Sequence, residues 1–280
     1  MGQRITFKPR PARILEPWLL ALGPRIVMGL FWLRLKNRYY LRHLRRKDLP
    51  DPIREYLQGF VNLDLKKSIA DTEFVVLDTE TTGFNVKKGD RIVSISAVRL
   101  KQGRIDLSDT FHALVNPDRD IPSKAAIVHE ILPRMVNGKP RFENILPDFI
   151  RYVGSAVLVA HHAWLDMSFL NREMIRLVGF PFQNVVVDTA ILDQALARNR
   201  ASSSLGGTIT DSSLSALAHR YGISIEERHS SFGDALATAQ IFQTMVKQAK
   251  GRGVVELRDL LRIALTSPSL EADKTGASPL

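Results

Sequence analysis

The sequence of 280 residues contains no cysteine. That absence excludes disulfide bonds, zinc sites built from thiolates and cysteine nucleophiles, and it fits a reducing compartment such as the cytoplasm. The sequence also lacks a long uninterrupted apolar run. A helix that spans a bilayer needs about 20 consecutive apolar residues, whereas the most apolar stretch, residues 17–33, is broken by Pro24 and Arg25. Together the two absences predict a cytoplasmic protein with no transmembrane helix at this place.

Excess charge is missing from three quarters of the chain. Residues 71–280 hold 24 Lys and Arg and 24 Asp and Glu, whereas residues 1–70 hold 15 basic and 5 acidic residues. The net charge of +10 therefore lies entirely in residues 1–70. This asymmetry predicts a neutral body with a basic extension over residues 1–70, which would attract anionic partners such as nucleic acid or lipid headgroups.

The basic extension has a helical pattern. Between Ile26 and Leu44 the apolar residues fall on one helical face, and most of the arginines lie elsewhere. Three roles remain open for such a helix. It could pack on the main domain, contact nucleic acid, or attach the protein peripherally to an anionic membrane surface through residues 1–50. Trp18 and Trp32 favour the membrane role, because tryptophan is enriched at membrane interfaces.

The remainder of the chain shows strand patterns followed by alternating strand and helix patterns. The predicted strands are 73–79, a hairpin over 91–105 that turns at Gln102-Gly103 and continues into 108–117, and then 156–163 and 182–189. The predicted helices are 51–59, 121–131, 143–154, 165–180, 189–198, 212–222 and 232–251. We expect Asp211 to cap the helix at 212–222. This order predicts an α/β domain over residues 71–252, with a mixed sheet flanked by helices. A C-terminal helix and a flexible tail are expected over residues 253–280.

Two acidic residues stand at the end of the first strand of this domain. The segment FVVLDTETTG, residues 74–83, places Asp78 and Glu80 one residue apart after an apolar run. Residues i and i+2 of a strand face the same way, about 7 Å apart, here at the strand edge where α/β proteins bind ligands. Unpaired carboxylates at such a place would raise each other's pKa. A divalent cation would remove the repulsion, and oxygen ligands suit Mg²⁺ or Mn²⁺.

Three further residues fit the same chemistry. Asp166 opens a predicted helix directly after a buried strand, and Asp234 opens the last long helix, five residues after His229. Taken singly, each acid could serve a helix N-terminus, and the histidine could be a surface loop residue. Together, four carboxylates and a histidine at the ends of elements form the set that two-metal phosphodiester hydrolysis requires.

Three segments carry a family resemblance. FVVLDTETTGFN, LVAHHAWLDMSFL and RHSSFGDALATAQIF resemble, in order and spacing, the three motifs of the DEDDh exonuclease family, which is the family of the proofreading epsilon subunit of bacterial DNA polymerase III. The resemblance spans residues 73–250 and does not extend to residues 1–70. It implies an RNase H-like fold with a mixed five-stranded sheet. It also implies a metal-dependent 3′→5′ exonuclease that releases nucleoside monophosphates from single-stranded DNA.

The resemblance also implies roles for individual residues. Two divalent cations, Mg²⁺ or Mn²⁺, would be held by Asp78, Glu80, Asp166 and Asp234. His229 would be the general base, since a histidine at this spacing before the last acid marks this branch of the family. Substrate contacts are implied for Thr79, Thr81, His129, His161 and Leu165. Leu165 stands where the family often has phenylalanine, and Glu130 stands where the family has glycine. Asp188 is expected to end a strand and cap the next helix, outside the site.

Several questions about function stay open at this level. The motifs do not separate DNA from RNA, since the 2′-hydroxyl is recognised by details that the sequence hides; DNA is the preferred substrate and an RNA-trimming exonuclease the alternative. A DNA polymerase complex is a candidate partner. A non-catalytic binding module is disfavoured, because all four acids and the histidine are present.

Overall fold

The structure is a computed structural model that describes residues 38–39, 42, 50–60, 64–201 and 211–265. The predicted basic helix is therefore described at three residues only, and the predicted flexible tail lies outside the described residues. The predictions about both segments stay predictions.

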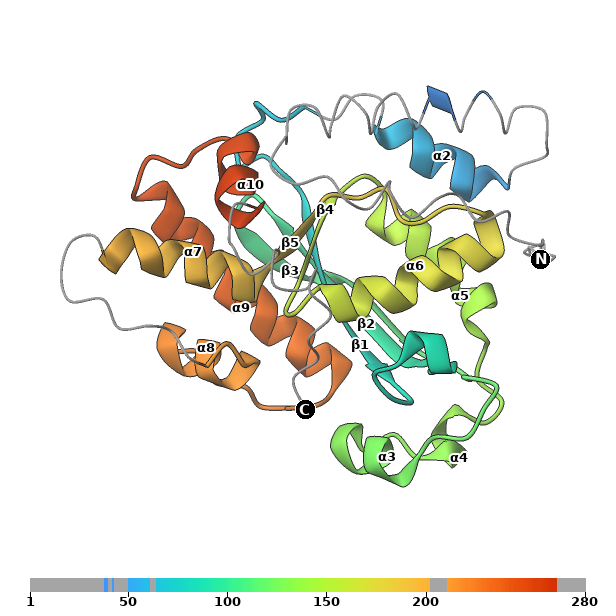
Figure 1. Cartoon of the computed structure of the whole chain (residues 1–280). Helices are drawn as coiled ribbons and strands as arrows, with labels where there is room; N and C mark the ends of the chain where they lie inside the picture. Colours follow the sequence, from blue (N-terminus) through green and yellow to red (C-terminus); the bar gives the residue numbers. More distant parts are fainter. Residues whose placement is uncertain (1–37, 40–41, 43–49, 61–63, 202–210, 266–280) are drawn as a thin grey trace.

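A single five-stranded sheet forms the centre of the described chain (Figure 1). Its strands are β1 (Phe74–Thr81), β2 (Ile92–Lys101), β3 (Arg104–Leu114), β4 (Val157–Ala160) and β5 (Val186–Asp188). They lie in the order β3-β2-β1-β4-β5. The first three strands are joined as antiparallel hairpins, whereas β4 runs parallel to β1 and β5 runs parallel to β4. The predicted mixed five-stranded sheet is confirmed.

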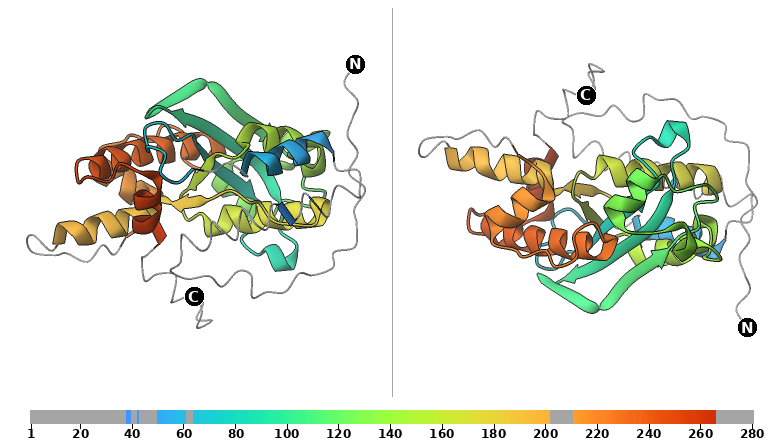
Figure 2. Two further views of the ribbon diagram at one scale, coloured as in Figure 1. Left: turned by 90° about the horizontal axis from the view of Figure 1, so that it is seen from above. Right: turned by 90° about the horizontal axis from the view of Figure 1, so that it is seen from below.

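Helices cover both faces of this sheet. Their bounds are α2 (Asp51–Gly59), η3 (Val86–Lys88), α3 (Ser123–His129), α4 (Pro133–Val136), α5 (Phe142–Val153), α6 (Trp164–Val178), α7 (Thr189–Ala201), α8 (Leu214–Tyr221), α9 (Ser231–Lys250) and α10 (Leu257–Leu265). The side chains of α2, α5 and α6 fill one apolar core, and those of α7, α9 and α10 fill the other. Figure 2 shows the sheet between these two groups of helices.

The central strand β1 is apolar because both of its faces are covered. Val75 and Leu77 belong to the core under α5 and α6, whereas Phe74 and Val76 belong to the core under α9. Side chains alternate between the faces of a strand. Continuing this alternation to the end of β1 puts its two acids on the face that α9 covers.

Helix α2 joins the core of the domain although it lies in the segment that we assigned to the extension. Ile53 and Leu57 are fully buried. The buried hydroxyl of Tyr56 donates a hydrogen bond to Asn184 Oδ1 over 2.7 Å and accepts one from the backbone N–H of Gln183 over 2.6 Å. These contacts tie α2 to the segment that leads into β5.

Some local predictions differ from the structure, among them the cap of α8 and the length of the last strand. The cap of α8 is Ser213, whose Oγ accepts from the backbone N–H of Ala216, and the prediction of Asp211 as the cap was wrong. Asp211 instead accepts a hydrogen bond from the backbone N–H of Ser213. The strand predicted over 182–189 is limited to β5, and before it the side-chain amide of Asn184 donates to the backbone oxygens of Gly154 and Ala156.

The helix pair α3–α4 projects beyond the ends of β1 and β2 (Figure 1). It is held by a small apolar cluster of Val93, Ile121, Ile131 and Val136. Glu130, the residue directly after α3, has a left-handed backbone with φ 58°. Glycine adopts this conformation without the strain that a side chain brings.

We therefore expect Glu130→Gly to stabilise the protein. The substitution should raise the free energy of unfolding by about 0.5 kcal/mol, since relief of backbone strain is partly offset by the greater freedom of glycine in the unfolded chain. Urea denaturation measures the change. Glu130→Ala is the matched control, because it removes the carboxylate but keeps the strain. A glycine variant no more stable than the alanine variant would contradict this explanation.

Candidate active site

The predicted acids meet at the end of β1. Asp78 and Glu80 lie on the face covered by α9, and Asp234 lies in the first turn of that helix. One carboxylate oxygen of each of these three acids lies within 4.8 Å of a carboxylate oxygen of the other two. The three acids form the group of potential metal ligands found among the described residues. The structure therefore brings together three of the four predicted ligands from two segments that lie far apart in the sequence.

Buried serines dock α9 beside the acids. The Oγ atom of Ser231, in the first turn of α9, lies 2.7 Å from Ser94 Oγ and 2.7 Å from Ser96 Oγ. In the sheet register Ser96 is the neighbour of Asp78, and Ser94 is the neighbour of Glu80. The hydroxyls that hold the helix therefore stand next to the carboxylates. This contact fixes the start of α9 on the sheet and thereby the position of Asp234, which lies three residues further along the helix.

The fourth acid reaches β1 from the other helical layer. Asp166 lies in the first turn of α6, and its Oδ1 accepts hydrogen bonds from the backbone N–H of Thr79 over 2.9 Å and from Thr79 Oγ1 over 2.7 Å. Its carboxylate is thereby held at the strand residue that separates Asp78 from Glu80. Asp166 raises the pKa values of both neighbours by charge repulsion, so all four acids interact.

The four acids are difficult to ionise together unless a positive charge lies close to them. Burial, followed by the charges of Asp234 and Asp166, raises the pKa of Glu80 to about 8. Burial raises the pKa of Asp166 to about 7. The pKa of Asp78 is also raised, first by burial and then by the other three acids. Ionising all four groups together is thus unfavourable without a cation.

The ligand set fits a hard divalent cation. All the converging donors are carboxylate oxygens, the type that Mg²⁺ and Mn²⁺ prefer. Moreover, Asp234 Oδ1 is buried and has no hydrogen-bond partner among the described residues. A buried polar atom without a partner is costly, and coordination of a cation would satisfy this one.

His229 lies beside the cluster on the segment that precedes α9. Burial raises the pKa of Asp234, whereas the charges of Arg228 and His229 lower it. The His229 side chain is exposed, and its backbone is left-handed with φ 64°. The predicted general base is therefore next to a predicted ligand and open to solvent.

The predicted substrate contacts surround the acids. Thr79 and Thr81 are buried on β1. His129 is buried at the end of α3 and interacts with the backbone of Thr81; its Nδ1 accepts from the backbone N–H of Ile131, and its Nε2 has no described partner. Leu165 is partly buried at the start of α6 and packs on the core. Their contacts with a substrate stay a prediction.

The His161 side chain is largely enclosed by neighbouring residues. Its Nδ1 lies 3.0 Å from Thr189 Oγ1, and its ring centre lies 4.4 Å from that of His162. Burial, with the charges of His162 and Arg228, lowers the pKa of His161 to about 3. The ring is therefore neutral near pH 7. Its predicted contact with substrate stays a prediction.

Asp188 has the structural role that we expected. Its Oδ1 accepts from the backbone N–H of Ala190 over 2.8 Å, in the first turn of α7. Its Oδ2 accepts from the backbone N–H of Ala163 over 2.9 Å, just before α6. Asp188 therefore caps one helix and ties a second helix to the end of β5.

Sequence reasoning missed Arg228 and the serines. Arg228 donates a hydrogen bond through Nη1 to Asp234 Oδ2. Its place directly before His229 was the available signal, but a basic residue in a loop has many alternative partners. Ser94 and Ser96 lie two residues apart in a strand and therefore face the same way. The sequence alone does not show that they share this face with Asp78 and Glu80.

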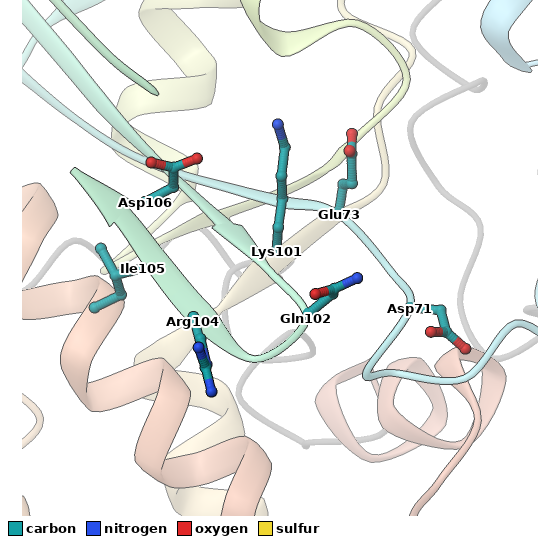
Figure 3. Close-up of a pocket in the computed structure, with 7 residues that line it drawn as sticks. All are labelled: Asp71, Glu73, Lys101, Gln102, Arg104, Ile105 and Asp106. Atoms are coloured by element: carbon teal, nitrogen blue, oxygen red, sulfur yellow. The ribbon is translucent and has the colours of Figure 1, made fainter. Parts of the chain in front are cut away.

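A cavity of about 540 Å³ lies at the opposite end of the sheet, at the turn between β2 and β3 (Figure 3). It is lined by Asp71, Glu73, Lys101, Gln102, Arg104, Ile105 and Asp106. Both basic and acidic side chains line it, and Arg104 points away from Lys101 (Figure 3). The described residues of this cavity do not form a group that could hold a metal.

The fold and the site together define a class of protein. The mixed sheet of five strands presents four acids and a histidine at the end of its central strand. This is the arrangement of a metal-dependent nuclease of RNase H-like fold. A family model described as "Exonuclease" (RNase_T) matches residues 75–242. The chain belongs to this exonuclease family, as the sequence motifs predicted.

Relatives in sequence include proteins named as DNA polymerase III or as similar to its epsilon subunit. A DNA polymerase III subunit epsilon-like protein of Rhodobacter capsulatus is 42% identical over 183 residues, which cover 65% of this chain and 25% of that protein. A PolC-type DNA polymerase III of Clostridium perfringens is 38% identical over 180 residues, which cover 64% of this chain and 12% of that protein. The chain thus spans a quarter or less of the length of these relatives.

Solved structures show the same fold. Exonuclease I of E. coli in complex with a dT13 oligonucleotide superposes with a TM-score of 0.55 at 16% identity, covering 65% of this chain and 43% of that one. A 3′-exonuclease that recognises the 3′ end of the histone mRNA stem-loop gives a TM-score of 0.50 at 17% identity, covering 63% and 82%. The RNase H-like fold is therefore confirmed.

The loop that carries Arg228 and His229 depends on Gly233. A Cβ atom at this position would lie 2.1 Å from the backbone oxygen of Glu227. We expect Gly233→Ala to force that loop away from α9 and to destabilise the protein by about 1–3 kcal/mol. Gly251→Ala at the other end of α9 is the control, since its nearest contact is 3.4 Å. Urea denaturation compares the two, and equal stabilities would contradict the close approach.

The raised pKa values predict how stability depends on pH. The pKa of Glu80 rises from 4.5 to about 8 and that of Asp166 from 3.8 to about 7 on folding. A raised pKa stabilises the folded state below the unfolded pKa, and this contribution is lost as pH rises through the folded value. In chelator the melting temperature should therefore fall between about pH 4 and pH 8, and Mg²⁺ or Mn²⁺ should restore it. Glu80→Gln should flatten the profile, and an unchanged slope in that variant would refute the assignment.

Proposed function

We propose that this chain is a metal-dependent 3′→5′ exonuclease that hydrolyses phosphodiester bonds at single-stranded 3′ ends of DNA and releases nucleoside monophosphates. The observation that carries the proposal is the convergence of Asp78, Glu80 and Asp234 within 4.8 Å, with Asp166 held against the same strand and His229 beside it. Exonuclease family membership supports the reaction class.

The side chains divide the chemistry among them. Asp78, Glu80, Asp166 and Asp234 would hold two Mg²⁺ or Mn²⁺ ions. When bound, these ions lower the pKa of water and offset charge on the scissile phosphate. His229, exposed and next to Asp234, would take the proton of the attacking water.

Exposed apolar side chains close in sequence to the predicted site residues favour an unpaired substrate. Phe84, three residues after Thr81, is 77% exposed, and Trp164, two residues before Asp166, is 62% exposed. Ile127, two residues before His129, is 77% exposed. Unpaired bases stack on such side chains, which contributes about 1–3 kcal/mol for each base on an aromatic ring. Bases within a duplex are not free to do so.

DNA is the favoured nucleic acid, because the relatives named above are DNA polymerase III proteins. The same relatives support a role in proofreading or repair, with a DNA polymerase complex as the partner and the cytoplasm as the location. RNA is the second candidate, because one protein with this fold recognises the 3′ end of an mRNA stem-loop.

The membrane hypothesis for residues 1–50 has no support from the described residues. Among these, no helix is long and apolar enough to cross a bilayer. Peripheral attachment through residues 1–50, which lie almost entirely outside the description, stays a prediction.

The test uses matched 5′-labelled single-stranded DNA and RNA oligomers with Mg²⁺ or Mn²⁺. We expect a ladder of 3′-shortened DNA products and slower shortening of RNA. Asp78→Asn should reduce the rate at least about 10³-fold because it removes a predicted metal ligand, and His229→Ala about 10²–10⁴-fold because it removes the base.

Asp109→Asn, at an acid on β3 away from the cluster, is the matched control and should keep the wild-type rate. Labelling the 3′ end instead separates the two directions, since a 3′→5′ enzyme then releases labelled mononucleotide at once. If the wild-type protein shortens neither polymer with either cation, the proposal is rejected. If it shortens RNA faster than DNA, RNA is the preferred substrate.

A further inference from the structure

Arg228 makes an ion pair with a predicted metal ligand. Its Nη1 donates to Asp234 Oδ2, and its Nε donates to Ser215 Oγ over 3.2 Å. The Asp234 side chain is 7% exposed and that of Arg228 is 32% exposed. Arg228 therefore spans from α8 to the first turn of α9 and places its charge at the edge of the acid cluster.

The contact with Asp234 places the charge of Arg228 beside the other acids. Asp234 has a carboxylate oxygen within 4.8 Å of those of Asp78 and Glu80. A guanidinium group carries a positive charge in folded proteins. This compensation of charge therefore does not depend on a bound ion.

The two oxygens of Asp234 are used differently. Oδ2 is taken by Arg228, whereas Oδ1 is buried without a described partner. One carboxylate thus carries the guanidinium on one oxygen and offers the other to the cluster. Like charges within a few ångströms repel strongly in a partly buried site. A divalent cation bound at Oδ1 would have Arg228 as its close positive neighbour.

We propose that Arg228 is the resident counterion of the acid cluster, which stabilises the protein before divalent cations bind and weakens their binding by competing for Asp234. This inference rests on the proposed function, because it concerns the same cation site. Arg228 is then a residue that sets cation affinity. It contacts the carboxylate of Asp234, so its effect on catalysis would pass through that ligand.

A simple structural role makes a different prediction. If Arg228 only linked α8 to α9 through Ser215, its loss would weaken the fold equally with and without cations. A comparable pair lies elsewhere in the fold, since Arg220 of α8 binds the fully buried Asp193 of α7, which also accepts from Tyr221. That pair belongs to no group of potential metal ligands among the described residues.

The experiment uses the full chain and its Arg228→Gln variant. Melting temperatures are measured in chelator and in Mn²⁺, and Mn²⁺ affinity is measured by isothermal titration calorimetry. We expect the variant to melt at a lower temperature than wild type in chelator, because Asp234 loses its partner. Its Mn²⁺ dissociation constant should be about tenfold lower than that of wild type, so that the difference in melting temperature shrinks in saturating Mn²⁺.

Two variants serve as controls. Arg220→Gln should lower the melting temperature equally in both conditions and leave Mn²⁺ affinity unchanged. Arg228→Lys, which keeps the charge, should stay close to wild type in both measurements. An Arg228→Gln variant that binds Mn²⁺ no more tightly than wild type would overturn the inference and leave the proposed function standing. A wild-type protein that binds no Mn²⁺ would overturn both.

Discussion

Repulsion among the carboxylates at the end of β1 is the constraint to which much of this structure responds. Asp78 and Glu80 arrive from the strand, Asp166 from α6 and Asp234 from α9, and burial raises the pKa of each. Such a cluster opposes folding wherever its members are ionised. It persists because apolar cores on both faces of the sheet hold the three elements in place.

The contacts that position the acids add almost no negative charge. Thr79 holds Asp166, and Ser231 holds α9 against Ser94 and Ser96. Hydroxyl groups can donate to a carboxylate or to one another, and they are small enough to lie beside the acids on the sheet. A carboxylate in place of any of these hydroxyls would add to the repulsion. The site is therefore built from short neutral donors around charged ligands.

Patterns within one segment allowed the sequence to predict β1, the faces of its acids and the helices that carry Asp166 and Asp234. Contacts between segments were beyond that reasoning. We predicted Asp211 as the cap of α8, whereas the structure has Ser213. Both are good capping residues and they lie two positions apart, so the sequence does not distinguish them. The packing of α2 depends on Tyr56 finding Asn184, which is distant in the sequence. The partner of Arg228 depends on the turn that precedes α9, where His229 is left-handed and Gly233 touches the backbone of Glu227.

The distribution of charge separates attraction of a polyanion from chemistry upon it. The acids and His229 all lie within the matched family segment, residues 75–242. The chain after residue 70 carries equal numbers of basic and acidic residues, so it gives no net attraction for nucleic acid. The cluster itself would repel phosphates until cations bind. The excess of ten positive charges in residues 1–70 therefore offers the long-range attraction that the exonuclease domain lacks. That attraction would weaken with salt, whereas cation binding in the partly buried cluster would be less screened.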